Sequence, residues 1–333
     1  MSALNCNYIN VTAELKKAVE DFIDEWNNTE LYITTRTSGS TGKPKEIRIL
    51  KSRMEKSAHM TGEFLQLKKN KKAVLCLSPS TIGGKMMIVR AIVLNLELIV
   101  IPVDGNPLAH IQADIDFIAM APLQLYNSLT HTTDKLKKIP HVIIGGGVIS
   151  AHVEKKLKNE CITIFHTYGM TETISHVAMR KVGLASCPYF TAIGENYFSL
   201  HNNLLVIHSP LLDSDSIITN DIVELIDTKN FIFKGRIDFV INSGGIKIHP
   251  EAVEQKLESF IQIDFFITGL KDEHLGEKVV LFIESSPYEL DKKDLLNYVS
   301  KYECPKEIYF LKEFVRTESG KINRPKTINL LSI

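Results

Sequence analysis

Several features are scarce or missing in this sequence, and each absence argues against a class of protein. The five cysteines are scattered, odd in number and never spaced as Cys-x-x-Cys. This argues against a disulfide framework or a structural zinc site, and for a reducing cytosol. Neither charge prevails, because Lys plus Arg and Asp plus Glu both total 39. No overall field therefore points to nucleic acid or to an anionic membrane as a partner.

Long hydrophobic runs are also missing. The first residues contain no apolar run of signal-peptide type. The most apolar stretch, 86–103, is interrupted by charged residues and a proline, which predicts a buried helix followed by a strand rather than a membrane span. The 333 residues are 44% hydrophobic and 23% charged, as in globular proteins long enough for two domains. We expect a soluble, cytoplasmic protein, and a homodimer is possible.

What the sequence does contain is an alternation of helical and strand patterns. Apolar residues recur at helical spacing from Leu15 to Trp26, and Ser52 with Glu55 forms a capping-box pattern for a helix ending near Leu67. Short apolar runs with helical patterns between them predict buried strands and an α/β architecture. The expected strands are 31–35, 46–50, 74–77, 98–103, 117–120, 142–144, 163–166, 203–209 and 222–226.

The pattern changes toward the C-terminus. From Ile193 the β segments are shorter and richer in turns, and we place a domain boundary near Asp238. Residues 1–237 would form a large N-terminal domain of mixed sheets and helices, and residues 238–333 a small α/β domain. In the small domain, one helix would span 250–261, and another would run from near Asp291 to just before Pro305.

The stretch Thr37 to Ile47, TSGSTGKPKEI, has the composition of a phosphate-binding loop but breaks the commonest pattern. A Walker loop requires G-x-x-x-x-G-K followed by Ser or Thr. Here Thr37 stands in place of the first glycine and Pro44 in place of the hydroxyl residue. Glycines can still turn backbone N–H groups toward an anion, with hydroxyls and lysines as further donors. A solvated Ser/Gly surface loop remains the alternative. The loop residues expected to bind phosphate are Thr37, Ser38, Gly39, Ser40, Thr41, Gly42, Lys43 and Lys45.

Three further motifs follow in order along the chain. The first is Tyr168-Gly169-Met170-Thr171-Glu172-Thr173, directly after a predicted strand. The second comprises Asn220-Asp221, 235–238 (Gly-Arg-Ile-Asp) and 243–248 (Ser-Gly-Gly-Ile-Lys-Ile). The third is 316–324, RTESGKINR. Taken singly, each has an ordinary structural explanation: a core tyrosine, a surface ion pair or a solvated turn lysine.

In this order, the four motifs resemble those of the adenylate-forming superfamily, which includes acyl-CoA synthetases, firefly luciferase and peptide-synthetase adenylation domains. The resemblance runs from about residue 35 to residue 325. Members usually carry a long subdomain before the Ser/Thr/Gly loop, whereas 36 residues precede it here. We therefore expect a short-form member, in which part of the wall supplied by that subdomain is missing or replaced.

The resemblance implies an ATP-dependent ligase with Mg²⁺, in which a carboxylate attacks the α-phosphate of ATP and a thiol then attacks the acyl-adenylate. The Ser/Thr/Gly loop would hold the β- and γ-phosphates. Thr171 would donate to the α-phosphate, Glu172 would hold the metal, and Lys321 would stabilise the charge that builds in adenylation. Asp221 would accept from the ribose, with Arg236 beside it. Tyr168 would pack on the adenine, and Gly145, Gly146 and Gly147 would let the backbone approach it closely. Gly169 and Met170 are further residues expected to bind ATP.

The glycines at 145–147 also follow a predicted strand, which hints at a dinucleotide fingerprint. Ser150 stands where the third glycine belongs, so that pattern is incomplete. The resemblance further implies CoA as co-substrate and a mobile C-terminal domain that swings about a hinge at Asp238. Gly244 and Gly245 would then line the tunnel for the pantetheine thiol, where side chains would obstruct it.

Two segments bear on the acid. Gly84-Lys85-Met-Met-x-Val-Arg90 and the run from Glu172 through His176 to Arg180 look like those of the o-succinylbenzoate–CoA ligases of menaquinone biosynthesis. That acid carries a second carboxylate, which needs a partner in a partly buried pocket. Gly84, Lys85, Arg90 and His176 are the candidate substrate-binding residues. For Lys85 and Arg90, charged residues at the rim of an amphipathic helix are the alternative, and for His176 a satisfied core histidine.

Three functions thus remain open. The first is an o-succinylbenzoate–CoA ligase. The second is an adenylating enzyme for another aryl, fatty or amino acid, or one that loads a carrier protein. The third is a nucleotide-binding relative without ligase activity. The joint presence of Glu172, Asp221, Arg236 and Lys321 argues against the third, because a degenerate site should have lost some of them.

Overall fold

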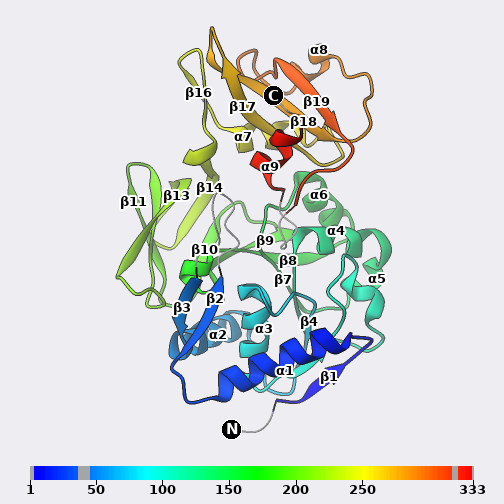
Figure 1. Cartoon of the computed structure of the whole chain (residues 1–333), viewed down its shortest axis with the longest axis vertical. Coiled ribbons are helices and arrows are strands. Elements are labelled where there is room, and N and C mark those ends of the chain that lie inside the picture. Colours follow the sequence, from blue (N-terminus) through cyan, green and yellow to red (C-terminus); the bar gives the residue numbers. More distant parts are fainter. Residues whose placement is uncertain (1–3, 37–45, 317–321, 332–333) are drawn as a thin grey trace.

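The computed structural model describes residues 4–36, 46–316 and 322–331. Within these residues, twelve strands form one large sheet, five form a second sheet and two form a hairpin. Figure 1 shows the second sheet and its helices, coloured yellow to red, stacked above the large sheet and the helices that cover it. Among the described residues, no helix is long and apolar enough to cross a membrane.

The large sheet has a parallel half and an antiparallel half. Neighbouring strands are parallel from β1 to β8 and antiparallel from β8 to β11. In spatial order they are β1 (Cys6–Tyr8), β5 (Glu97–Val100), β4 (Lys72–Leu75), β6 (Phe117–Met120), β7 (His141–Ile144), β8 (Thr163–Gly169), β9 (His176–Gly183), β10 (Phe190–Ala192), β14 (Asn230–Arg236), β13 (Ser216–Leu225), β12 (Leu204–His208) and β11 (Tyr197–His201).

Helices cover both faces of the parallel half. Successive strand residues point to opposite faces, so Ala73 and Leu75 of β4 lie in one apolar cluster and Val74 in another. The first cluster contains residues of α1 (Ala13–Asn27), α2 (Lys51–Leu65) and α3 (Ile82–Val93). The second contains residues of η1 (Pro107–His110), α4 (Pro122–His131), α5 (Thr133–Leu136) and α6 (Ala151–Asn159). Strands buried on both faces explain the continuous apolar runs in the sequence.

The hairpin of β2 (Tyr32–Arg36) and β3 (Glu46–Leu50) leads directly into α2. The predicted capping box at Ser52 is wrong, because α2 begins at Lys51 and its N-cap Leu50 makes no side-chain hydrogen bond. The backbone N–H of Lys51 instead donates to the carbonyl of Leu31 (2.8 Å). This backbone bond at the base of the hairpin satisfies the N–H of the first residue of α2.

The second sheet begins beyond η3 (Ile237–Phe239), so the chain passes between sheets where Asp238 lies. Its strands are β15 (Ile241–Ser243), β16 (Ile246–Ile248), β17 (Phe265–Asp272), β18 (Gly276–Glu284) and β19 (Glu307–Leu311). Its helices are α7 (Pro250–Leu257), α8 (Lys292–Leu295), α9 (Arg324–Ile328) and η4 (Asn329–Leu331). Apolar clusters pack on both faces of this sheet.

The two helices expected in the C-terminal part begin as predicted but are shorter. Pro250 opens α7, which ends at Leu257 rather than Ile261. The Asp291 side chain caps α8, but α8 ends at Leu295 and hydrogen-bonded turns follow it. In these turns the Glu303 carboxylate accepts from the Ser300 backbone N–H (2.9 Å). Such side-chain bonds to the backbone compete with continued helix.

Candidate active site

The turn after β8 lies at the centre of the candidate site. Gly169 at the end of β8 pairs with His176 at the start of β9, and η2 (Thr171–Thr173) lies between them. A Cβ on Gly169 would come within 2.2 Å of the Ser175 carbonyl oxygen, so only glycine fits this crossing. Ile174, buried and β-branched, has φ +68°, a conformation that costs free energy and is held only by its surroundings.

The predicted catalytic residues Thr171 and Glu172 both lie on this turn. Thr171 is half-buried and Glu172 is exposed. The described residues contain no cluster of three or more His, Cys, Asp or Glu side chains able to hold a metal. Magnesium commonly takes one or two carboxylates together with substrate phosphates. The exposed carboxylate of Glu172 therefore fits a Mg²⁺ ion that binds with the nucleotide.

On one side of the turn, Tyr168 is packed against a group of aromatic rings. Its ring centroid lies 5.0 Å from that of Phe231 and 5.8 Å from that of Phe190. Its hydroxyl donates to Oδ2 of Asp221. Burial and the charge of Asp221 raise the pKa of Tyr168 well above its ordinary value, so this hydroxyl keeps its proton and remains a donor.

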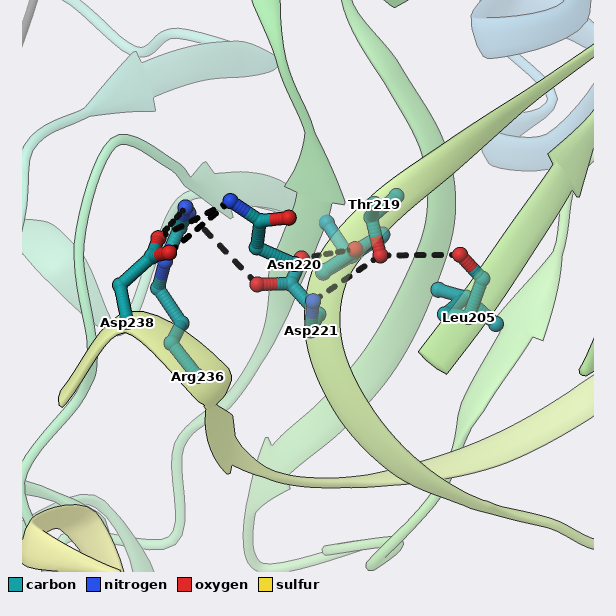
Figure 2. Close-up of polar contacts among 7 residues, drawn as sticks. Leu205, Thr219, Asn220, Asp221, Arg236 and Asp238 are labelled. Carbon is teal, nitrogen blue, oxygen red and sulfur yellow. Dashed lines mark hydrogen bonds and ion pairs between the residues drawn. The ribbon is translucent and has the colours of Figure 1, made fainter. Parts of the chain in front are cut away.

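Asp221 belongs to a cluster of polar and charged groups that links β13 and β14 of the large sheet to η3 (Figure 2). It pairs in register with Arg236 on β14, and Arg236 Nη1 lies 3.6 Å from Asp221 Oδ1. Arg236 Nη2 donates to Asp238 Oδ2 (2.8 Å), and Asn220 Nδ2 donates to both Asp238 oxygens (3.0 and 3.1 Å). We call Asn220, Asp221, Arg236 and Asp238 the aspartate cluster.

Within this cluster the arginine is balanced by two carboxylates. Burial alone would lower the pKa of Arg236, but the hydrogen bond to Asp238 and the charge of Asp221 outweigh burial and raise it. Asp221 is only 5% exposed, and its backbone N–H donates to Thr219 Oγ1 (3.1 Å). Thr219 Oγ1 in turn donates to the Leu205 carbonyl (2.9 Å), so neighbouring strands fix this part of β13 (Figure 2).

The glycines at 145–147 are the first three residues of the connection between β7 and α6, which spans 145–150. A Cβ on Gly145 would approach Thr167 Oγ1 to 2.7 Å, and Gly146 has φ +83°. Ser150 caps α6 by accepting from the Val153 N–H (3.3 Å). Thus Ser150, which replaces the third glycine of a dinucleotide fingerprint, has a capping role here.

On the other side of the turn lies a second group, the buried arginine cluster of Thr61, Arg90, Ser175 and His176. Arg90 Nη2 donates to Ser175 Oγ (2.7 Å), and Arg90 Nε donates to Thr61 Oγ1 (3.3 Å). His176 Nε2 lies 2.9 Å from Thr61 Oγ1, and its Nδ1 lies 3.3 Å from Ser175 Oγ.

The proton positions in this cluster follow from its partners. Thr61 donates its hydroxyl proton to the Ser57 carbonyl (3.0 Å), so Thr61 Oγ1 accepts from both Arg90 and His176. His176 therefore carries its proton on Nε2 and is neutral. Burial and the charge of Arg90 lower the pKa of His176 well below its ordinary value.

Arg90 is 2% exposed, and no carboxylate of the described residues pairs with it. Its Nη1 makes one contact with the Met87 sulfur at 3.8 Å, which is a weak acceptor. Burial lowers the pKa of Arg90 to about 9, so the guanidinium is charged at neutral pH. The cluster therefore contains a buried cation with donor capacity left and no counter-charge among the described residues.

The neighbours of Lys85 and Gly84 differ from those of Arg90. The Lys85 ammonium lies 4.5 Å from the centroid of the Phe22 ring and 3.7 Å from Glu25 Oε2, both on α1. A Cβ on Gly84 would come within 2.1 Å of the Ser78 carbonyl oxygen. The structure thus brings Arg90 and His176 together, and places Lys85 and Gly84 in packing contacts of α3.

Gly244 and Gly245 form the turn between β15 and β16, with φ +58° and +82°. This two-residue turn accounts for both glycines without a ligand. A Cβ on Gly245 would meet nothing within 4 Å, and one on Gly244 would lie 3.3 Å from a Leu275 methyl carbon. The tunnel for a thiol stays a prediction.

Nine of the predicted site residues lie outside the described residues. They are Thr37, Ser38, Gly39, Ser40, Thr41, Gly42, Lys43, Lys45 and Lys321. Their neighbours are described: Arg36 pairs with Glu46 across the hairpin, and Arg316 forms a bridge with Ile322. Sequence reasoning missed Thr61, Ser175 and Asn220 as partners of site residues. The sequence did contain an indication for Thr61. It lies four positions after Ser57, so both polar residues fall on the buried face of the predicted helix, where a polar side chain needs a partner.

The chain is similar in sequence and in fold to several known proteins. A family model described as "AMP-binding enzyme" matches residues 8–195, more than half of the chain. A 2-succinylbenzoate–CoA ligase of Bacillus cytotoxicus is 24% identical over 92% of this chain and 72% of its own length. Among solved structures, an acyl-CoA synthetase (AMP-forming)/AMP-acid ligase II-like protein of Dyadobacter fermentans is 32% identical, with TM-score 0.64 over 96% of this chain and 95% of that one.

The o-succinylbenzoate CoA synthetase of Bacillus subtilis, solved with ATP and magnesium, has TM-score 0.73 at 18% identity, over 89% of this chain and 69% of that one. This likeness confirms the expected α/β fold of adenylate-forming enzymes. The family model matches most of the parallel half of the large sheet, and the Dyadobacter fermentans protein matches nearly the whole chain. This chain therefore belongs to the family of AMP-binding, adenylate-forming enzymes.

Proposed function

We propose that the protein is an ATP-dependent acid–thiol ligase that activates a dicarboxylic acid, with o-succinylbenzoate as the leading candidate. The observation that carries the choice of acid is Arg90: a buried guanidinium beside the turn of Thr171 and Glu172, with no carboxylate partner among the described residues. A buried charge without a counter-charge is costly. A substrate carboxylate would remove that cost on binding.

The aspartate cluster would bind the ribose of ATP. Asp221 would accept from the ribose hydroxyls, as a buried carboxylate that contacts with Tyr168 and Arg236 hold in place. Arg236, held by Asp238, would keep Asp221 ionised and oriented. Tyr168 and the connection at 145–147 would lie beside the adenine.

Thr171 and Glu172 would act at the phosphates. Thr171 would donate to the α-phosphate, and Glu172 would hold Mg²⁺ together with ATP oxygens. When bound, Mg²⁺ neutralises phosphate charge as the carboxylate approaches. The Thr37–Lys45 loop and Lys321 would contribute donors and positive charge to the same phosphates.

The reaction would proceed in two steps. A carboxylate oxygen bonds to the α-phosphorus while the bond to the pyrophosphate oxygen breaks, which leaves acyl-AMP and pyrophosphate. The sulfur of CoA then bonds to the acyl carbon while AMP leaves, and the thiol proton is released. Both steps move negative charge, so positioning and electrostatic stabilisation would supply most of the acceleration.

The second carboxylate would bind Arg90. The two Nη groups of a guanidinium can bind a carboxylate in a bidentate manner, and Nη1 here has only the Met87 sulfur as partner among the described residues. The neutral His176 and Ser175 would hold the guanidinium in place. The names of the Bacillus relatives support o-succinylbenzoate as the acid.

The test is an assay of the purified protein with ATP, Mg²⁺, CoA and a panel of carboxylic acids, following AMP and thioester. We expect turnover with o-succinylbenzoate and little with monocarboxylic fatty acids. Turnover restricted to another acid would eliminate o-succinylbenzoate, and nucleotide binding without turnover of any acid would contradict ligase activity.

A site variant separates the half-reactions. Lys321→Ala should nearly abolish adenylation, measured as pyrophosphate release, but leave thioester formation from a supplied acyl-adenylate largely intact. Equal loss of both half-reactions would contradict the role proposed for Lys321.

A further inference from the structure

A buried histidine, His166, has no role in the function proposed above. It lies on β8 two residues before Tyr168, so both side chains point to the same face of the strand. It is 8% exposed. Its Nε2 lies 2.9 Å from the carbonyl oxygen of Gly147, in the connection between β7 and α6. On the opposite edge of the ring, Arg180 Nε donates to His166 Nδ1 (3.3 Å).

These two partners fix the tautomer of the imidazole. The guanidinium of Arg180 can only donate, so Nδ1 must be unprotonated. The Gly147 carbonyl can only accept, so Nε2 must carry the proton. A second proton on Nδ1 would face the N–H of Arg180. Burial and the charge of Arg180 lower the pKa of His166 to about 3, and the ring is neutral at physiological pH.

Arg180 is itself held in place from two directions. It pairs in register with His166 across β8 and β9, and its guanidinium lies 5.5 Å from the centroid of the Phe190 ring. Its Nη2 donates to Glu154 Oε1 on α6. Since α6 follows directly after the 145–150 connection, the pair of His166 and Arg180 contacts that connection at Gly147 and the first turn of α6 at Glu154.

The same pair adjoins the proposed adenine side of the site. The Phe190 ring lies 5.3 Å from the His166 ring and 5.8 Å from the Tyr168 ring. Gly145 is held by its N–H bond to the Met120 carbonyl (3.1 Å) and by close approach to Thr167. Gly147 is held differently, because its carbonyl oxygen accepts a hydrogen bond from Nε2 of His166.

We propose that His166 is a positioning residue for adenine nucleotides: its Nε2–H holds the Gly147 carbonyl at a fixed distance from Tyr168, and Arg180 selects the tautomer that makes this possible. The inference rests on the proposed function to the extent that the 145–147 connection faces the nucleotide. His166 does not touch the phosphates or the acid. Its loss should therefore change nucleotide affinity and leave the affinity for the acid unchanged.

Two substitutions test the hydrogen bond. His166→Phe keeps an aromatic ring against Phe190 but removes the donor, and His166→Gln keeps an N–H donor. Binding of ATP or AMP by calorimetry should weaken roughly three- to tenfold in His166→Phe, the loss of one hydrogen bond, and recover toward wild type in His166→Gln. The matched control is His208→Phe, which removes a histidine that bonds Ser199 on β11, at the far end of the same sheet (2.8 Å), and should leave nucleotide affinity unchanged.

A spectroscopic measurement tests the tautomer of His166 directly, and the unchanged affinity for the acid is the readout that separates positioning from a general structural role. Correlation of ¹⁵N and ¹H in histidine-labelled wild-type protein should show His166 as the Nε2–H tautomer, and Arg180→Met should convert it to a mixture. This experiment also serves if His166→Phe does not fold. Finding the Nδ1–H tautomer in the wild type would overturn the inference.

The calorimetric outcomes separate this inference from the proposed function. If wild type binds nucleotide and His166→Phe binds it equally well, or if both His166 variants weaken it by the same factor, the positioning role is wrong while the ligase proposal stands. If wild type binds no adenine nucleotide, the proposed function fails and the inference fails with it.

Discussion

The two groups that flank the turn of Thr171 and Glu172 differ in how their charges are balanced. In the aspartate cluster, Arg236 has the carboxylates of Asp221 and Asp238 as partners and is half-exposed. In the buried arginine cluster, Arg90 is 2% exposed and has hydroxyl, thioether and imidazole neighbours, with no carboxylate among the described residues. The first cluster is complete without a ligand, whereas the second has an uncompensated charge that a substrate carboxylate would neutralise.

The largest expected effect comes from removing that uncompensated charge. Arg90→Met should raise KM for a dicarboxylic acid roughly a hundredfold or more, since a desolvated charge pair contributes about 2–5 kcal/mol. KM for ATP should stay unchanged, and thermal stability should hold or rise, because methionine replaces an unpaired buried charge. Arg90→Lys serves as the matched control and should be intermediate. An equal increase in both KM values would contradict the division between the two clusters.

Removal of the ribose acceptor is the complementary change. Asp221→Asn keeps the size of the side chain but removes the charge that would accept from the ribose, and should weaken ATP binding roughly tenfold to a hundredfold, as for hydrogen bonds to a charged group. The acid should bind as before. Asp227→Asn, an exposed residue in the turn between β13 and β14, is the control. Calorimetric titration with ATP measures the affinity of both variants. An unchanged affinity in Asp221→Asn would refute the ribose assignment.

A third change tests whether Gly84 acts through packing or through the acid. Gly84→Ala places a methyl group 2.1 Å from the Ser78 carbonyl and should lower the free energy of unfolding by about 1–3 kcal/mol, as overpacking does. Gly83→Ala, whose methyl would lie 3.3 Å from a Leu77 methyl carbon, should cost much less. Urea denaturation measures both. If Gly84→Ala keeps full stability but loses affinity for the acid, Gly84 contacts the acid instead.

The smallest expected effect concerns a carboxylate outside both clusters. Glu258, at the end of α7, accepts from the Ala151 N–H at the start of α6, and so joins the C-terminal part to the large sheet's helices. Burial raises its pKa to about 7, with Glu254 and Glu154 adding to the shift. The hydrogen bond from Ala151 opposes this shift, but burial outweighs it, so the folded state favours the protonated carboxyl over the ionised one. Its contribution to stability is present below pH 4.5 and is lost as pH rises toward 7.

Thermal melts from pH 5 to pH 8 check this prediction. Wild type should lose stability relative to Glu258→Gln as pH rises, because the glutamine cannot ionise. If the melting temperatures of the two proteins change with pH by the same amount across that range, Glu258 does not titrate at this contact.

Much of the fold could be predicted because the parallel strands are buried on both faces. Their continuous apolar runs gave β6 at its observed bounds, Phe117–Met120, and β7 to within one residue. Errors occurred where a contact distant in sequence overrides a local pattern. Ser52 has the spacing of a cap, but the Leu31 carbonyl already binds the Lys51 N–H at the start of α2.

The candidate site was predictable to the extent that motifs are local in sequence. Asp221 and Arg236 were expected at the same ribose. The structure pairs them across β13 and β14, and the ribose contact stays a prediction. The Thr61 partnership with Arg90 and His176 was not predictable, because these residues come from α2, α3 and β9 and meet only through packing. Lys85 and Arg90 looked equivalent in the sequence. They lie five positions apart on one helix, so their side chains point in different directions and meet different neighbours.

The central claim is that Arg90 selects a dicarboxylic acid, and one double comparison tests it most directly. It measures kcat/KM of wild type and Arg90→Met for o-succinylbenzoate and for the analogue that lacks the carboxylate not activated by ATP. We predict that wild type prefers the dicarboxylic acid roughly a hundredfold or more, and that Arg90→Met loses most of this preference by losing activity toward o-succinylbenzoate alone. Equal activity of wild type toward both acids, or an undiminished preference in Arg90→Met, would contradict the account.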